Sequence, residues 1–324
     1  MHNDQAAGLR AMHRHRQNQW STQPEGAVKT QSAPQTQPVA TESQAQPKGK
    51  PVRKDKPVRV LAVASGKGGV GKTNVAVNLG VSLSKMGNRV LLMDADMGLA
   101  NVDVMLGLQT QYNLSHVLDG EKSLKEVMVS APGGLKIIPA ASGVKRMAQL
   151  TPTENAGIIN AFSEIDGLLD VLLIDTAAGI ADSVVSFCRA SQEVVVVVTD
   201  EPASMTDAYA LIKVLSRDYQ LTRFQLLANM AKSEKHGKML YDKFSQVCEQ
   251  FLAVQIQYLG TIPFDGQLRD SIQKQTPVTL ANPASVSAKA FRNLAQKIDA
   301  WPIPTDITGY LQFFVERLFE TKSD

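Results

Sequence analysis

Seven short apolar runs follow a polar N-terminal stretch, and segments of helical period separate most of them. The runs are continuous rather than alternating, which is typical of strands that are covered on both faces. Strands that alternate with helices predict an α/β fold, with a mostly parallel central sheet, right-handed crossovers and helices on both faces. The predicted strands are residues 58–65, 89–96, 135–140, 170–179, 193–200, 224–230 and 256–265.

Four zones divide the chain. Residues 1–16 place apolar side chains at helical spacing and predict a short N-terminal helix. Residues 17–57 are rich in Gln, Pro, Ser, Thr and Lys, so we predict a disordered linker. Residues 58–300 contain all seven apolar runs and predict one domain of the α/β class. Residues 301–324 predict a C-terminal amphipathic helix.

Composition narrows the classes of function. The two cysteines, Cys188 and Cys248, lie too far apart to form a C-x-x-C motif. Residues 1–59 carry ten Lys and Arg against four Asp and Glu, and since the whole chain has net charge +3, the remainder carries −3. A basic tail on an acidic body is either a partner-contacting arm or a solvated linker, and we expect no specific nucleic-acid binding. Without a signal segment or a membrane-spanning run, a cytoplasmic location is expected.

The stretch SGKGGVGKT directly follows the first predicted strand and opens a predicted helix. Its G-x-x-x-x-G-K-T spacing is that of a P-loop NTPase, in which backbone N–H groups and a helix N-terminus surround the phosphates of ATP. Lys72 is expected to reach the β- and γ-phosphates, and the Thr73 hydroxyl to bind Mg²⁺. The expected nucleotide-binding residues of this loop are Gly66, Lys67, Gly68, Gly69, Val70, Gly71, Lys72, Thr73 and Asn74.

Carboxylates end two of the predicted strands. DVLLIDTAAG places Asp175 at the position of a Walker-B aspartate, which holds Mg²⁺ directly or through water. A strand-end aspartate in isolation is more often a turn former, and the phosphate loop favours the functional interpretation here. LLMDADMGLANVD places Asp94 and Asp96 after the second strand, where two carboxylates can divide metal binding from water orientation. Ordinary loop acidity is the alternative.

Lys67 is a second lysine where a phosphate loop needs only one, and it resembles the signature lysine of the deviant Walker-A ATPases. That family includes MinD, the ParA partition proteins and the nitrogenase iron protein. The resemblance implies a slow regulatory ATPase of the SIMIBI type that forms an ATP-dependent homodimer, in which Lys67 reaches the phosphates bound by the partner subunit. Lys67, Lys72 and Asp96 would then be catalytic, with Asp96 positioning the attacking water. A merely solvated loop lysine is the alternative.

Three segments, DADMGLANVD, IDTAAGI and TDEPASMTDAYALIKVL, are similar to patterns of the MinD branch. They imply a metal site of Thr73, Asp94 and Asp175, in which Asp94 acts through water. Asn229, at the end of LLANM, matches the adenine-contacting asparagine of that branch, and Pro263 lies in its adenine-loop region. Spacing alone identifies neither of these last two residues.

The two ends of the chain narrow the resemblance further. DQAAGLR, residues 4–10, resembles the DQAxxLR motif of the flagellar-number regulators called FlhG or FleN, and DITGYLQFFVERLF resembles their C-terminus. The resemblance implies a switch that controls flagellar number and placement together with the SRP-type GTPase FlhF. Some members also restrain the transcription activator FleQ or bind flagellar switch proteins. The linker of residues 17–57 departs from the family and leaves the geometry of the FlhF contact open.

Both terminal segments carry a functional expectation and an alternative. A helix from Asp4 to Arg10 would present Gln5 to another active site, so we expect it to stimulate FlhF; a frayed terminus is the alternative. The C-terminal stripe resembles a membrane-targeting helix, which implies reversible contact with the inner membrane. A helix packed permanently on its own domain is the alternative. The stripe contains Ile307, Tyr310, Leu311, Phe314, Leu318 and Phe319.

Two other classes of function compete with this interpretation. A ParA-like partition ATPase binds nucleoid DNA, which requires a basic surface on the folded body, whereas this body carries −3. An iron–sulfur carrier is excluded because no cysteine lies near the Walker-B segment.

Overall fold

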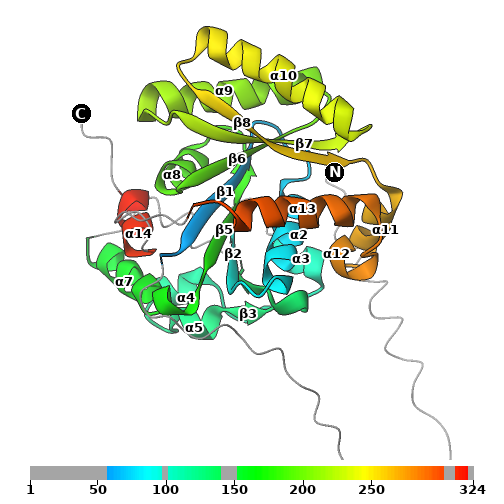
Figure 1. Cartoon of the computed structure of the whole chain (residues 1–324). Coiled ribbons are helices and arrows are strands. Elements are labelled where there is room, and N and C mark those ends of the chain that lie inside the picture. Colours follow the sequence, from blue (N-terminus) through cyan, green and yellow to red (C-terminus); the bar gives the residue numbers. More distant parts are fainter. Residues whose placement is uncertain (1–56, 97–100, 140–151, 303–310, 320–324) are drawn as a thin grey trace, which may run out of the picture. The chain divides into compact units, whose positions relative to one another are not determined.

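A central sheet organises the structure, which is a computed structural model (Figure 1). Among the described residues, eight strands lie in the order β3-β4-β2-β5-β1-β6-β7-β8, and only β3 runs antiparallel to its neighbour. The mostly parallel α/β fold expected from the apolar runs is therefore confirmed. The strands are β1 Arg59–Ser65, β2 Val90–Ala95, β3 Val129–Ser130, β4 Lys136–Ile138, β5 Val171–Ala178, β6 Glu193–Val198, β7 Arg223–Ala231 and β8 Gln255–Pro263.

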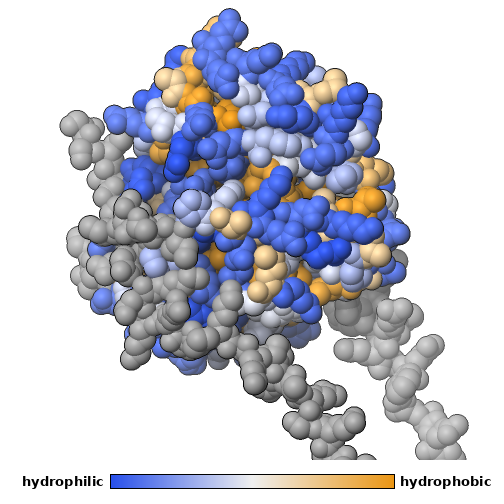
Figure 2. Space-filling view, viewed as in Figure 1, coloured by the Kyte–Doolittle hydropathy of each residue, from blue (hydrophilic) through white to orange (hydrophobic). Residues whose placement is uncertain are grey.

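The structure describes residues 57–96, 101–139, 152–302 and 311–319. The expected N-terminal helix and all but the last residue of the expected linker lie outside these residues. Ile307 and Tyr310 of the C-terminal stripe also lie outside them. No helix in the described part of the chain is long and apolar enough to cross a membrane. On the face seen in Figure 2, hydrophilic side chains predominate and apolar ones form separate patches.

Helices cover both faces of the sheet, as the continuous apolar runs require (Figure 1). One face packs against α2, α12 and α13, and the other against α7, α8, α9, α10 and α14. The helices are α2 Lys72–Lys85, α3 Val102–Leu106, α4 Leu114–Leu118, α5 Leu124–Val127, α7 Pro152–Ser163, α8 Asp182–Ala190, α9 Pro202–Tyr219, α10 Glu234–Phe251, α11 Gly266–Gln273, α12 Val278–Ala281, α13 Val286–Asp299 and α14 Leu311–Phe319, with 3₁₀ turns η1 Pro132–Gly134 and η2 Asp166–Leu168.

Strand β1 shows how its sequence produces this arrangement. Leu61 and Val63 point into the core under α2 and α13, whereas Ala62 and Ala64 point into the core under α8 and α9. All four are fully buried. The first strand therefore lies in the interior of the sheet, and the phosphate loop that follows it starts from a fixed position.

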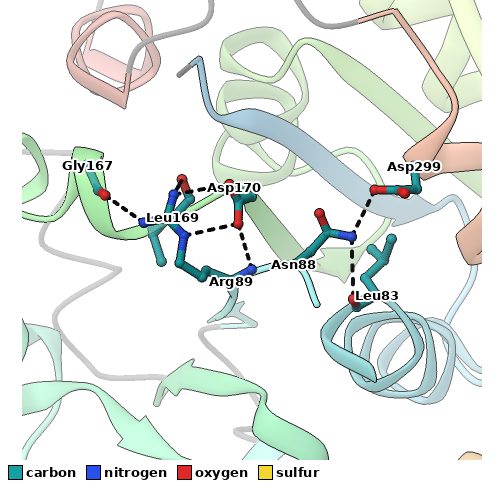
Figure 3. A network of polar contacts seen from close by, with 7 residues as sticks. All are labelled: Leu83, Asn88, Arg89, Gly167, Leu169, Asp170 and Asp299. Atoms are coloured by element: carbon teal, nitrogen blue, oxygen red, sulfur yellow. Dashed lines mark hydrogen bonds and ion pairs between the residues drawn. The ribbon is translucent and has the colours of Figure 1, made fainter. Parts of the chain in front are cut away.

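A polar network fixes the starts of β2 and β5 (Figure 3). It lies at the amino ends of these strands, opposite the end of the sheet that carries the phosphate loop. The Arg89 guanidinium donates to both carboxylate oxygens of Asp170, at 3.0 and 3.1 Å, and the Arg89 backbone N–H donates to the same group at 2.9 Å. Asn88 donates to the Asp299 carboxylate at 2.8 Å. Two-pronged arginine–carboxylate pairs have defined geometry, so this network fixes the alignment of β2 with β5.

The C-terminal helix α14 packs on α7 and α8. Leu311 and Phe314 of the expected stripe are buried against these helices, and Leu318 is nearly so. Both ends of α14 are also held through its main chain. The Leu311 N–H donates to Asp166 at 3.4 Å, and Arg189 donates to the Arg317 carbonyl at 2.8 Å. In this structure the apolar face of the helix is therefore covered by its own domain.

Candidate functional site

The phosphate loop joins β1 to α2 at the carboxyl edge of the sheet, where ligands bind in open α/β folds. Ser65 ends the strand, and its hydroxyl donates to the Lys67 carbonyl at 2.8 Å, which stabilises the turn. Gly71 has a φ of 87°, in the left-handed region that favours glycine. Helix α2 begins at Lys72 without a capping side chain, so its first amides remain available to an anion.

Gly66 brings the loop directly against the backbone of α9. A Cβ placed on Gly66 would lie 2.0 Å from the Asp207 carbonyl carbon and 2.4 Å from the Ala208 nitrogen. No side chain fits in this space, so the first glycine of the motif is required by packing as well as by the turn. The loop and α9 consequently form one packed unit.

Two buried side chains follow at the start of α2. Lys72 and Asn74 are each only 8% exposed. Asn74 accepts a hydrogen bond from Asn78 at 2.8 Å, and Asn78 in turn accepts from the backbone and hydroxyl of Thr279 on α12. This chain of amides connects the phosphate-binding helix to the segment that follows β8.

Two carboxylates stand side by side at the ends of β2 and β5. Asp94 and Asp175 are partners in register across these strands, and each is 1% exposed. Asp94 accepts hydrogen bonds from the backbone N–H groups of Asp96, Asn101 and Val102, at 3.1, 3.1 and 3.2 Å. Asp94 therefore also holds the start of α3. By contrast, neither carboxylate oxygen of Asp175 has a hydrogen-bond partner among the described residues.

This burial changes the acidity of both groups. Burial away from water raises the pKa of Asp175 to about 7, although the nearby Thr73 hydroxyl and Lys72 ammonium lower it. The Thr73 hydroxyl nevertheless makes no hydrogen bond of good geometry with this carboxylate. Burial also raises the pKa of Asp94 to about 6, against the three backbone N–H donors. A buried carboxylate without a partner is stabilised in its charged form by a cation. Mg²⁺ prefers carboxylate and hydroxyl oxygens, so Thr73, Asp94 and Asp175 fit this ion.

Asp96 follows directly after β2 and is half-buried. Its backbone lies within hydrogen-bond distance of Asp94, so the structure brings Asp94, Asp96 and Asp175 to one side of the phosphate loop. Residues 97–100, which continue this loop, lie outside the described residues.

Lys67 lies on the other side of the loop and is paired within its own chain. Its Nζ is 2.5 Å from the Glu201 carboxylate, and the two side chains are 37% and 59% exposed. Glu201 immediately precedes α9 and was not identified from the sequence. The two residues lie 134 positions apart, and nothing in TDEPAS distinguishes this glutamate from an ordinary helix-start acid.

Asn229 lies at the end of β7 and is 3% exposed. Its Nδ2 donates to the Val70 carbonyl of the phosphate loop at 2.8 Å, while its Oδ1 has no partner among the described residues. Pro263 is placed in register with Ala231 at the ends of β8 and β7. The exposed side chain of Phe264 follows it, an apolar surface that the sequence analysis did not identify. The structure therefore places Asn229 against the loop, whereas no hydrogen bond or ion pair joins Pro263 to the loop in the described part of the chain.

Comparisons with known proteins agree with this geometry. The family model ParA, described as NUBPL iron-transfer P-loop NTPase, matches residues 56–299. Antiactivator FleN of Pseudomonas aeruginosa is 55% identical over 264 residues, covering 82% of this chain and 94% of that protein. Flagellum site-determining protein YlxH of Helicobacter pylori is 33% identical, covering 79% and 88%. The septum site-determining protein MinD of Pyrococcus horikoshii OT3, solved with Mg-ADP, is 26% identical with a TM-score of 0.60 and covers 75% and 96%.

The iron transfer in the family description is a property of the proteins it describes. In this chain Cys188 and Cys248 are both buried in the core, and burial raises the pKa of each thiol to about 12. The match to the family spans residues 56–299, which contain the phosphate loop and the two strand-end carboxylates. The extent of the family match and the identity to FleN show that the chain is a P-loop ATPase of the ParA/MinD family, in its FlhG/FleN-like branch.

Proposed function

We propose that this protein is an ATP-driven dimerisation switch that regulates flagellar number and placement. The observation that carries the proposal is the difference between the two lysines of the phosphate loop: Lys67 is partly exposed and turned toward Glu201, whereas Lys72 is buried at the start of α2. A cation so placed can complete a charged site on another subunit, as an arginine finger does. The likeness to FleN and to the flagellum site-determining protein of H. pylori supports the flagellar role.

The described residues would divide the work as follows. Lys72 and the amides of the loop bind the phosphates of ATP, and Thr73, Asp94 and Asp175 hold Mg²⁺. Mg²⁺ supplies positive charge to the phosphate oxygens. Asp96 holds the attacking water in line with the γ-phosphate.

Asn229 would then contact the adenine. Because its Nδ2 is already bound to the Val70 carbonyl, the amide is held with its free Oδ1 as an acceptor. An acceptor suits the exocyclic amine of adenine and repels the carbonyl oxygen of guanine. This supports ATP as the nucleotide. Pro263 and the segment after β8 would line the other side of the base.

A size-exclusion experiment with light scattering tests the switch. We expect the Asp96→Ala protein to bind ATP, hydrolyse it very slowly and accumulate as a dimer with ATP and Mg²⁺, but not with ADP. A protein that stays monomeric with ATP in both the wild-type and Asp96→Ala forms contradicts the switch. ATP-dependent, salt-sensitive retention of DNA by residues 58–300 would instead support the partition type of function.

We also propose reversible contact with the cytoplasmic membrane through α14. Its apolar face is covered by α7 and α8 in this structure, so the helix must leave this site before it can bind lipid. Acidic residues outnumber basic ones from residue 306 to the end of the chain, so attraction to anionic lipid should be weak. Co-sedimentation with liposomes should depend on ATP and should disappear when residues 306–324 are deleted. Binding that ignores the deletion contradicts this role.

A third element of the proposal concerns partners. The likeness to FlhG and FleN supports action with the GTPase FlhF and with the activator FleQ or flagellar switch proteins. We expect a peptide of residues 1–20 to stimulate GTP turnover by purified FlhF, because Gln5 can orient an attacking water. The Gln5→Ala peptide should lose most of this stimulation. If neither peptide stimulates at saturating concentration, the N-terminal segment has no activator role.

A further inference from the structure

The side chain that precedes α9 contacts the phosphate loop. The N-cap position of α9 is occupied by a glutamate, whose side chain is longer than those of the Asp, Asn, Ser and Thr residues that usually cap helices. Glu201 occupies this N-cap position but makes no capping hydrogen bond. Its carboxylate extends to Lys67 of the phosphate loop instead. The Glu201 side chain thus contacts the loop and does not cap its own helix.

The surroundings of Glu201 hold it in place. The neighbouring Asp200 pairs with His236 Nε2 at 3.1 Å, which connects the β6–α9 loop to α10. On the other side, α9 packs against Gly66 with no space for a side chain. Glu201 therefore projects from a fixed support, whereas Lys67 is a long side chain whose side-chain partner among the described residues is Glu201. Of the two, the lysine is the part that can move.

We propose that Glu201 is a positioning residue that holds Lys67 within its own subunit until a second subunit presents nucleotide phosphates. This inference rests on the proposed dimerisation switch. Exposed ion pairs are weak, and a triphosphate offers several negative oxygens, so the lysine can exchange one partner for the other on assembly. The pair thus opposes dimerisation, because it must break before Lys67 can reach the phosphates of the other subunit, and the contact with those phosphates offsets this loss.

The charge-removing variant Glu201→Gln keeps the length of the side chain and tests this directly. If the pair restrains Lys67, its loss should lower the protein concentration at half-maximal ATP-dependent dimerisation by about two- to fivefold, the range that exposed pairs allow. The effect should shrink as salt is raised, because salt screens the pair in the wild-type protein. Asp218→Asn, which removes an exposed acid from the far end of the same helix, should change neither quantity.

A double-mutant cycle distinguishes action of Glu201 through Lys67 from a direct electrostatic effect of its charge on the bound nucleotide. In a Lys67→Ala background, Glu201→Gln should leave both ATP affinity and self-association unchanged, because the partner of the glutamate is gone. If Glu201→Gln strengthened ATP binding equally with and without Lys67, the glutamate would act only by direct electrostatic repulsion of the nucleotide. Weaker dimerisation of Glu201→Gln would show that Glu201 binds a lysine across the dimer. Either outcome overturns the proposal.

The wild-type control distinguishes the two levels of inference. If the wild-type protein forms no ATP-dependent dimer, the proposed switch itself fails. If the wild-type protein dimerises and Glu201→Gln dimerises at the same concentration, only the role of Glu201 fails.

Discussion

The two sides of the phosphate loop differ in how much of the site one chain can build. On the side of β2 and β5, Asp94 and Asp175 are almost completely buried and paired in register by the sheet. On the side of α9, Glu201 is exposed, Lys67 is partly exposed, and one ion pair joins them. Burial raises the free energy of a charged group and fixes its position, whereas an exposed charged group can move with little change in free energy.

This difference suits the two sides of the loop to two tasks, binding of the metal ion on one side and contact with a second subunit on the other. The buried side is complete except for a cation, since both oxygens of Asp175 lack a partner among the described residues. The exposed side is occupied by a weak internal contact that another molecule can replace. Binding of Mg²⁺ should therefore depend on the buried side, and assembly on the exposed side.

The largest expected effect separates the two lysines of the loop. Lys72→Ala should weaken ATP binding by at least about 100-fold, because a buried charge facing the phosphates is lost. Lys67→Ala should bind ATP within a few-fold of wild type yet fail to dimerise or hydrolyse it. Titration with a fluorescent ATP analogue measures both, with Lys85→Ala at the end of α2 as the control. Equal loss of binding in the two loop variants would remove the distinction.

A steric substitution tests whether α9 provides a rigid support for the exposed side. Gly66→Ala should destabilise the fold by about 3 kcal/mol or more, because the new Cβ has no space beside the α9 backbone. Gly68→Ala is the matched control: its Cβ would lie 4.0 Å from the nearest neighbour, an ordinary contact. Urea unfolding of both variants gives the comparison. Similar stability of the two would mean that the loop can shift away from α9.

The pH dependence of stability probes the buried side. The folded state raises the pKa of Asp175 to about 7 and that of Asp94 to about 6, so it favours their protonated forms. The stability that this protonation contributes is complete below pH of about 4 and is lost as pH rises to about 7.

Asp175→Asn should remove much of this loss and stabilise the nucleotide-free protein at pH 7.5, because no buried charge then forms. Thermal unfolding between pH 5 and pH 8 measures the effect, with the exposed Asp182→Asn as the control. Wild-type and Asp175→Asn curves that run parallel over this range would show that the carboxylate titrates elsewhere.

The smallest expected effect comes from the Ser65 hydroxyl, which joins the end of β1 to the main chain of Lys67. Ser65→Ala removes the hydrogen bond to the Lys67 carbonyl and should reduce the free energy of unfolding by about 1 kcal/mol. ATP affinity should change by no more than a few-fold. Ser163→Ala, which removes an exposed hydroxyl contact at the end of α7, should change the stability less. Loss of ATP binding by Ser65→Ala would place Ser65 on the nucleotide-binding side of the comparison.

Much of the fold followed from local pattern. The apolar runs located seven of the eight described strands, because a strand buried on both faces is continuously apolar. The missed strand, β3, has two residues and lies at the sheet edge, so it leaves no run to detect. The phosphate loop was found by spacing, since its glycines and lysine must be close in sequence to act together.

Contacts between distant segments were not accessible in this way. No local pattern connects Glu201 with Lys67, and none shows that Asp94 holds the first amides of α3. The amphipathic stripe of α14 predicted a helix with one apolar face, but not what covers that face. Amphipathicity specifies that a surface must be buried; only the tertiary structure, or a membrane, specifies against what.

The attachment of α14 has a consequence for how its sequence can change. The two contacts described at its ends involve main-chain atoms of the helix: the Leu311 N–H donates to Asp166, and the Arg317 carbonyl accepts from Arg189. Main-chain groups persist through any substitution other than proline, so these two contacts place no demand on the side chains of α14. The inward positions Leu311, Phe314 and Leu318 must remain apolar, because they are buried against the domain. Under the proposed membrane role, substitutions on the outer surface of this helix would change its lipid preference while the two main-chain contacts are retained.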